Sequence, residues 1–286
     1  MKRLLLLGFL CLALGMPALA LPLWELEGTD NRIRLLGSVH FLRARDYPLP
    51  AAIMTAYADA DIVVFELDMS AIDPLATQNL LQRLALDPGG NDLEDYLGAR
   101  NYRSAATLAK SIDIDLATLR SYEPWFAALQ ITQLRLAQLG FDGSYGIETR
   151  LTMQAVADAK TIRGLESMAE QLGSLDSLPA PAQRVFLMRT LEDAAEIEDD
   201  LDDIVTAWRE GDTQTLEKEL LHGLEDQTEL HDRILIKRNR NWAKQILGFT
   251  KTGKRYLVIV GALHLVGDDS VIRMLDDAGY PARQIR

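Results

Sequence analysis

Short apolar runs that stop at a glycine or an acidic residue recur along this chain and predict buried strands. The clearest are residues 61–68 and 256–260, in which Val, Ile, Leu and Phe dominate. A run of this length, rich in β-branched residues and bounded by a turn residue, is typical of a strand covered on both faces. The same reasoning predicts an opening hairpin at 24–27 and 32–37 and short strands at 161–166 and 282–285.

Helical periodicity fills the middle of the chain. Residues 73–140 are almost wholly helical in pattern, and a second, acidic region runs from about 181 to 248, with a break expected at Gly211 or Gly223. Further helices are expected at 48–60, 147–160 and 268–278. Strands alternating with helices at both ends, around a helical middle, predict an α/β fold with a mostly parallel central sheet, flanking helices and a large helical insertion.

Residues 1–20 have the features of a secretory signal peptide. Two basic residues precede an apolar core, and Ala18-Leu19-Ala20 supplies the cleavage pattern of small residues. The apolar core is too short for a comfortable membrane span, and no later stretch approaches the roughly 18 apolar residues that would suggest one. We therefore expect a periplasmic or secreted protein, in which residues 21–286 form one α/β domain that starts near Leu21 and has no membrane span.

Composition narrows the classes of partner. Asp and Glu outnumber Lys and Arg by 42 to 30, which gives a net charge of −12. This balance argues against binding of nucleic acid, because such binding requires clustered basic residues. It also argues against electrostatic binding to anionic lipid. The single cysteine, Cys11, lies in the leader, so the mature chain would have no disulfide and no thiolate chemistry. A peptide or small-molecule substrate remains as the expected partner.

A Gly-x-x-His pattern occurs twice, at residues 37–40 and 261–264, each time where an apolar run ends. Its histidine then lies just past the carboxyl end of a strand, where open α/β sheets place their ligands. Two of the four histidines in the chain, His40 and His264, share this placement. One such motif arises easily by chance, but two of them make a site with paired imidazoles the leading idea.

Two glutamates, Glu66 and Glu166, also close predicted strands. If the strands lie side by side in a parallel sheet, both carboxylates and both imidazoles converge at its carboxyl edge. This donor set suits divalent Zn, Mn, Co or Fe. A bound water could serve as the nucleophile, and a carboxylate not bound to the metal could act as general base. A structural alternative exists for Glu166, which could cap the helix that follows it.

Other candidate residues carry weaker signals. Arg238 could hold a substrate carboxylate or stabilise an oxyanion, or it could offset the helix dipole. Tyr145 and Glu148 are candidate contributors at the start of a helix, whereas His222 and His231 are interpreted as surface or packing residues. The glycine-rich segment before that helix lacks the phosphate-loop and dinucleotide fingerprints, and no nucleophile elbow of a serine hydrolase is present.

Several of these segments together resemble the TraB/GumN family. The segments are Leu35–His40, Asp46–Pro50, Val64–Asp68, Gly164–Glu166, Arg238-Asn239 and Val260–Gly267. The resemblance implies a relation to the TIKI metalloproteases, which cleave peptides with a divalent metal, and a distant one to erythromycin-esterase-like (EreA) and ChaN-like proteins, whose fold we expect here.

By position, the resemblance implies that His40 and His264 are the paired histidines and that Glu66 and Glu166 are their acidic partners. Arg238 and Asn239 would be the polar pair on a helix. The chain departs from the family pattern at Glu148, where Asp is expected, so a strict geometric role there is in doubt.

Residues and resemblance together predict an exported, divalent-metal-dependent hydrolase, specifically a peptidase. His40, His264 and one of the two glutamates, Glu66 or Glu166, would bind Mn, Co or Zn. The other glutamate would be the base, and Arg238 with Asn239 would complete the catalytic set. The alternative is a non-catalytic protein that binds haem or another ligand in the same pocket. Two carboxylates facing two histidines suit a hard divalent ion better than haem.

Overall fold

One mixed sheet organises the chain, which a computed structural model describes over residues 21–198, 200–224 and 226–285. Its strands lie in the order β4-β3-β5-β2-β1-β6. Their bounds are β1 Leu23–Leu26, β2 Ile33–Ser38, β3 Ile62–Phe65, β4 Thr161–Gly164, β5 Tyr256–Gly261 and β6 Ala282–Gln284. The four strands from β4 to β2 are parallel, and β1 runs antiparallel to both β2 and β6. The mostly parallel sheet and the opening hairpin are therefore confirmed.

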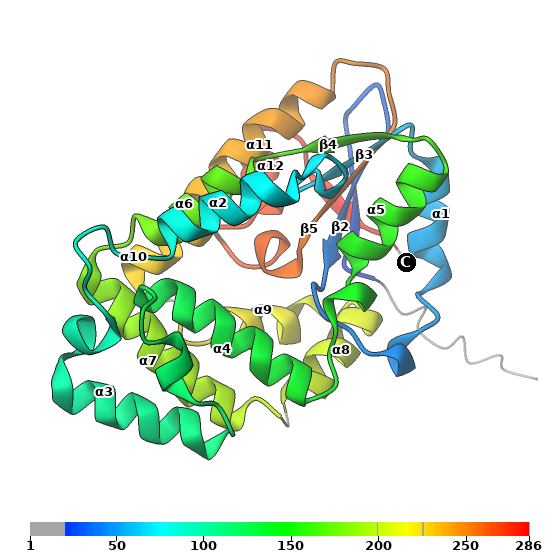
Figure 1. Ribbon diagram of the computed structural model, residues 1–286. Coiled ribbons are helices and arrows are strands. Elements are labelled where there is room, and N and C mark those ends of the chain that lie inside the picture. The colour runs from blue at the N-terminus through cyan, green and yellow to red at the C-terminus, as the bar shows by residue number, and fades with distance from the viewer. Residues whose placement is uncertain (1–20, 199, 225, 286) are drawn as a thin grey trace, which may run out of the picture.

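Helices cover both faces of the sheet, as Figure 1 shows. Along β5 the side chains alternate, so that Leu257 and Ile259 pack on one face while Val258 and Val260 pack on the other. The first face is covered by α1 (Ala51–Asp59) and α5 (Ile147–Ala157), and the second by α11 (Lys237–Phe249) and α12 (Val271–Asp277). This burial on both faces explains why the central strands are almost continuously apolar.

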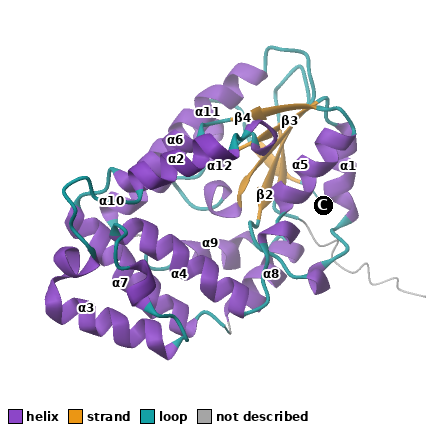
Figure 2. Ribbon diagram, viewed as in Figure 1, coloured by secondary structure: helices purple, strands orange, loops and turns teal. Residues whose placement is uncertain are grey.

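The predicted helical insertion is confirmed, in two parts on either side of α5 and β4. Its helices are α2 (Pro74–Leu84), α3 (Leu93–Ser111) and α4 (Pro124–Gln138), then α6 (Met168–Asp176), α7 (Ala180–Glu196), α8 (Asp200–Glu210), α9 (Thr213–Leu221) and α10 (Thr228–His231). Several of them, among them α3, α4 and α7, gather below the sheet in Figures 1 and 2. Those three share a core of their own that includes Leu93, Ile131 and Leu187. Gly211 and Gly223, predicted as alternative breaks, both interrupt the second part with positive φ angles of 65° and 70°.

The signal peptide and the lack of a membrane span were both predicted from the sequence, and the described residues bear only on the second. The expected signal peptide, residues 1–20, lies outside the described residues. Among the residues that are described, no helix is both long and apolar enough to cross a membrane.

The start of α5 is held against the end of β2 by close backbone contacts. The Ile147 N–H donates to the carbonyl oxygen of Val39 at 3.1 Å. At Gly146 the backbones approach so closely that a Cβ would lie 2.1 Å from the carbonyl oxygen of His40. Only glycine fits there, and the contact brings the first turn of α5, with Glu148, beside His40.

We expect Gly146→Ala to destabilise the protein by about 1–3 kcal/mol, because the added methyl group forces α5 away from β2. The measurement is the free energy of unfolding in urea. Gly173→Ala in α6 is the matched control, since a Cβ there meets nothing within 4 Å. It should stabilise the helix by roughly 0.5–1 kcal/mol. Equal effects of the two substitutions would contradict the close approach at Gly146.

Candidate functional site

The carboxyl ends of the parallel strands carry the residues that the sequence singled out. His40 follows β2, Glu66 follows β3, Glu166 follows β4, and His264 lies in the short 3-10 turn Ala262–Leu265 after β5. Arg238 reaches the same edge from α11. Because parallel strands end at one edge of a sheet, residues far apart in sequence become neighbours there.

Arg238 lies at the centre of this edge and connects its acidic residues. Its Nη2 donates to Glu66 Oε2 at 2.7 Å and to Glu166 Oε1 at 2.6 Å, and its Nε lies 3.1 Å from both oxygens of Glu166. Its Nη1 donates to the carbonyl oxygen of Ile234 at 3.0 Å and lies 3.3 Å from Nε2 of His264. The guanidinium has five N–H donors, and these contacts engage all of them.

A turn of π-helix lies immediately before the helix that carries Arg238. Residues Asp232–Ile236 form this turn. The Ile234 carbonyl oxygen lies within the turn and receives Nη1 of Arg238. Single π-helical turns of this kind are rare and occur frequently at functional sites, where they change which side chains share a face.

Glu66 is buried and ionised. Its Oε1 accepts the Gly261 N–H at 2.7 Å, and its Oε2 accepts from Gln171 at 3.1 Å as well as from Arg238. Burial alone would raise the pKa of this carboxyl, but the positive charges of His40 and Arg238 and the hydrogen bond from the Gly261 N–H outweigh it and lower the pKa. Glu66 is therefore a carboxylate throughout the physiological range.

Glu166 is a second buried carboxyl with the opposite shift. Burial raises its pKa, and the hydrogen bonds and charge of Arg238 offset this only in part. Both of its oxygens face the guanidinium. The nearby Ser167, and not Glu166, caps the following helix α6 by accepting from the Glu170 N–H. Glu166 thus belongs to the polar cluster and is not the helix cap that the sequence also allowed.

His264 is buried, at 4% exposure, and its tautomer follows from its neighbours. The side-chain amide of Asn239 donates to the carbonyl oxygen of Asp269 at 2.8 Å, so its oxygen is the atom that lies 2.6 Å from Nδ1 of His264. Nδ1 therefore carries the proton, and Nε2 presents a lone pair to Arg238. Burial lowers the pKa of His264 to about 3, which keeps the ring neutral, and Trp242 packs against it with ring centroids 4.4 Å apart.

His40 has a different environment. Its Nδ1 lies 2.9 Å from Oε1 of Glu148, which also accepts a hydrogen bond from the hydroxyl of Ser38. The negative charge of Glu148 and its hydrogen bond raise the pKa of His40 to about 9. Its side chain is 57% accessible, so the ring faces open space.

His40, Glu66 and Glu148 form the one group of potential metal ligands in the described part of the chain, with one donor atom from each residue within 4.8 Å of the others. Oε2 of Glu148 is buried and has no hydrogen-bond partner among the described residues. His264 and Glu166, proposed as ligands from the sequence, direct their lone pairs at Arg238 and lie outside this group.

Gly261 leaves room for a ligand between these side chains. A Cβ built on it would lie 3.3 Å from Glu66 Oε1, 3.4 Å from His40 Nε2 and 3.6 Å from His264 Cδ2. An ionised carboxylate and an imidazole nitrogen, which gives up its proton when a metal binds, face this one small space and are donors that a divalent cation accepts. The sequence named Glu148 only as a possible contributor, because its place at the start of α5 gave no direct sign of its contact with His40.

A cavity of about 560 Å³ opens over this polar floor. The floor contributes Ser38, His40, Glu66, Arg238 and His264. The insertion helices and their flanking turns supply a wall that is almost entirely apolar: Leu129, Leu136, Phe141, Leu172, Leu175, Phe186, Ile197, Leu201, Ile204, Val205, Leu220 and Ile234. The cavity therefore joins a charged, hydrogen-bonded end to a hydrocarbon-lined chamber.

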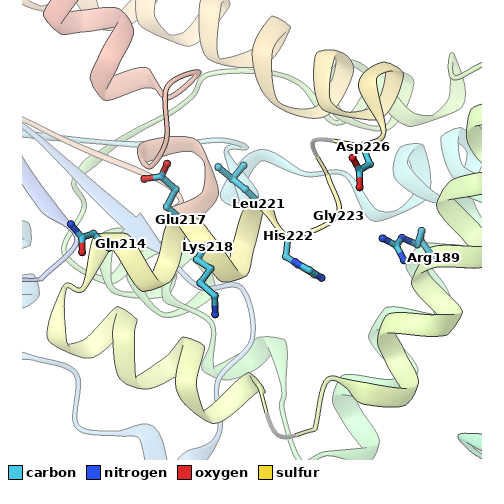
Figure 3. A pocket seen from close by; sticks show the side chains of 8 residues that line it. All are labelled: Arg189, Gln214, Glu217, Lys218, Leu221, His222, Gly223 and Asp226. Atoms are coloured by element: carbon cyan, nitrogen blue, oxygen red, sulfur yellow. The ribbon is translucent and has the colours of Figure 1, made fainter.

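A second pocket, of about 540 Å³, lies around α9 and has no comparable arrangement. Figure 3 shows that its side chains diverge: Glu217 and Leu221 point to one side of α9, and Lys218 points to the other. His222 lines this pocket without a neighbouring group of metal ligands in the described residues. The strand-end cavity is therefore the candidate site.

Comparisons with known proteins give relatives over almost the whole chain. The profile of the TraB/PrgY/gumN family matches residues 22–284. A protein called YbaP from Escherichia coli (strain K12), described as uncharacterized, is 25% identical over 247 residues, which cover 86% of this chain and 88% of the relative. An uncharacterized protein from Treponema pallidum (strain Nichols) is 24% identical over 268 residues, covering 88% of this chain and 79% of the relative. No solved structure matches.

We expect Glu148→Gln to lower the pKa of His40 from about 9 towards the ordinary value of 6.5, because the substitution removes the charge that favours the imidazolium. NMR titration of the four histidine rings, in the presence of a chelator, measures this. Glu192→Gln, in α7, is the control and should leave His40 unchanged. A His40 pKa that is the same in Glu148→Gln and in the unmodified protein would contradict the pairing.

Arg238→Met should lower the free energy of unfolding at pH 8 by about 3–5 kcal/mol, because it leaves Glu66 and Glu166 buried without a counter-charge. Without the guanidinium, burial raises both carboxyl pKa values above their unfolded values. The deficit should therefore shrink as the pH falls and the carboxyls take up protons. Urea unfolding between pH 8 and pH 5 measures this.

Arg255→Met is the matched control for Arg238→Met. Arg255 also contacts two carboxylates, Asp59 at 3.2 Å and Asp61 at 2.6 Å, but its side chain is 47% exposed. Its loss should cost at most about 1 kcal/mol. A pH-independent deficit in Arg238→Met, or equal deficits in the two variants, would contradict the role of Arg238.

Proposed function

The chain belongs to the TraB/PrgY/gumN family, and from the geometry of its site we propose that it is an exported, divalent-metal-dependent hydrolase that cleaves amide bonds, with peptides as the expected substrates. The observation that carries the proposal is the group of His40, Glu66 and Glu148, in which a buried carboxylate oxygen has no partner among the described residues. Export rests on the leader sequence of residues 1–20.

The donor set determines which ions fit. One imidazole nitrogen and two carboxylates suit Mn, Co or Zn, and three protein ligands match the usual catalytic site that keeps a position open for water or substrate. Such an ion, when bound, polarises a carbonyl group and lowers the pKa of a water molecule.

Residues of the protein would orient and balance the charge of the groups around such an ion. Glu148, whose Oε1 lies 2.9 Å from Nδ1 of His40, would supply the second carboxylate of the donor set through its unpartnered Oε2. Arg238 balances the charge of Glu66 and, with all its donors engaged, acts as a positioning residue. Glu166 turns both of its oxygens to the guanidinium of Arg238 and is not among the residues that line the cavity, so in this arrangement it helps to hold Arg238 in place.

The sequence and the geometry propose different roles for His264. The sequence pairs it with His40 as a metal ligand, whereas its Nε2 lies 3.3 Å from Nη1 of Arg238 and its Nδ1 is held by Asn239. In this arrangement His264 and Asn239 fix the position of Arg238. Metal content separates the two roles, because loss of a ligand removes the ion and loss of a positioning residue does not.

The test uses protein purified without an affinity tag or chelator. We expect about one equivalent of a divalent metal by elemental analysis, and cleavage of a peptide library that is lost on chelation and restored by Mn, Co or Zn. His40→Ala and Glu66→Gln should each lose the metal and lower kcat/KM at least about 100-fold. His264→Ala should retain metal.

His222→Ala, in the pocket around α9, is the matched control and should keep both metal and activity. Full cleavage by the double variant His40→Ala/His264→Ala would overturn the proposal. Binding without turnover would favour the alternative, a protein that holds haem or another ligand beside His40, for which the apolar cavity wall is the supporting observation. An unchanged Soret band on titration with haemin would remove haem from that alternative.

A further inference from the structure

The wall of the strand-end cavity differs in chemistry from its floor. Six of its side chains, Leu129, Phe141, Leu172, Phe186, Leu201 and Leu220, come from different elements of the insertion and converge on one space. Its volume of about 560 Å³ is within the range of small-molecule sites. Cavities lined in this way exclude water and accept apolar ligands.

The few polar side chains in the wall are already engaged. The hydroxyl of Thr132 donates to the carbonyl oxygen of Ala128 at 3.1 Å, and that of Ser174 donates to the carbonyl oxygen of Glu170 at 3.0 Å. Gln171 donates to Glu66. The surrounding backbone is largely helical, so most of its N–H and C=O groups bond within their own helices.

The scarcity of free hydrogen-bonding groups in the wall distinguishes between an apolar peptide and a hydrocarbon chain as the occupant of the chamber. A peptide segment in the chamber would bring amide groups that lose water and find few hydrogen-bond partners, which is unfavourable. A hydrocarbon chain has no such groups, and each methylene that it buries adds favourable contact with the wall. The chamber therefore fits an alkyl chain better than a peptide backbone.

We propose that the cavity takes the single hydrocarbon chain of a long-chain acyl substrate and holds the acyl carbonyl at the floor, beside His40 and Glu66. The reaction, which rests on the proposed hydrolase function, adds water to that carbonyl and breaks its bond to nitrogen. The hydroxyl of the water stays on the acyl carbon and its other proton passes to the leaving nitrogen, so that a carboxylic acid carrying the chain and an amine are released; the acid then ionises by giving its proton to the amine. The acyl side of the scissile amide is thus the side that determines specificity.

The test is a series of acyl p-nitroanilides, from butanoyl to hexadecanoyl, together with the corresponding p-nitrophenyl esters and an apolar tripeptide p-nitroanilide. We expect kcat/KM for the anilides to rise about fourfold for each added methylene until the chamber is full. The tripeptide should be a poorer substrate than the long acyl anilides. A rate independent of chain length, or a preference for the tripeptide, would overturn the proposal.

Two variants that fill the chamber from different helices keep the test independent of any one substitution. Leu129→Trp in α4 and Ile204→Trp in α8 should lower kcat/KM for the longest chains at least tenfold more than for butanoyl. Leu134→Trp is the matched control, because Leu134 lies on the same helix as Leu129 but is 45% exposed and does not line the cavity. Circular dichroism confirms that each variant is folded.

Binding is measured separately with cis-parinaric acid, a fluorescent fatty acid, and its displacement by palmitate. Saturable binding that Leu129→Trp and Ile204→Trp weaken, without hydrolysis of any substrate, would support the ligand class and overturn the hydrolase. Hydrolysis of peptides without binding of cis-parinaric acid would overturn this inference and leave the hydrolase standing. The p-nitrophenyl esters are intrinsically more reactive than the anilides, so they test the dependence on chain length alone, and a rate that does not rise with chain length in the esters would overturn the proposal.

Discussion

The arrangement of the site depends on the contacts of a single partly buried guanidinium, that of Arg238, whose side chain is 13% exposed. The guanidinium joins the ends of β3 and β4 through Glu66 and Glu166, and it joins both to His264 and to the π-helical turn through Ile234. Charged groups that are largely shielded from solvent are stable only when their hydrogen bonds are satisfied together. The ends of β3 and β4 are therefore positioned together by a residue that comes from α11, far from both in the sequence.

The sheet and the helical insertion contribute different parts of the site. The parallel strands deliver polar side chains to one edge, which is a consequence of their common direction. The insertion helices place apolar side chains across from that edge and so surround the charged floor with hydrocarbon. Low polarity strengthens every electrostatic contact on the floor, so the wall affects both what can bind there and how firmly Arg238 holds its partners.

Much of this could be read from the sequence because it depends on local pattern. Residues 61–68 and 256–260 were predicted as strands, and β3 and β5 lie there; their common direction then placed Glu66 near the glycine at 261. Glu148 was only a weak candidate, since its contact with His40 depends on the approach of α5 to β2 at Gly146, which involves backbone atoms alone. The apolar chamber could not be predicted from the sequence either, because a helical pattern shows that one face of a helix is buried but not which residues lie opposite that face.

The two Gly-x-x-His motifs show how one sequence pattern yields two environments. In the parallel pairing of β2 with β5, Ser38 lies opposite Gly261, so the first motif is displaced by one residue relative to the second. His40 thus meets Glu148 and turns Nε2 to the cavity, whereas both nitrogens of His264 are engaged, by Asn239 and Arg238. Which nitrogen of a histidine is free is decided by the partner of the other nitrogen. Equal motifs therefore give the site one imidazole that can meet a ligand and one that holds its surroundings in place.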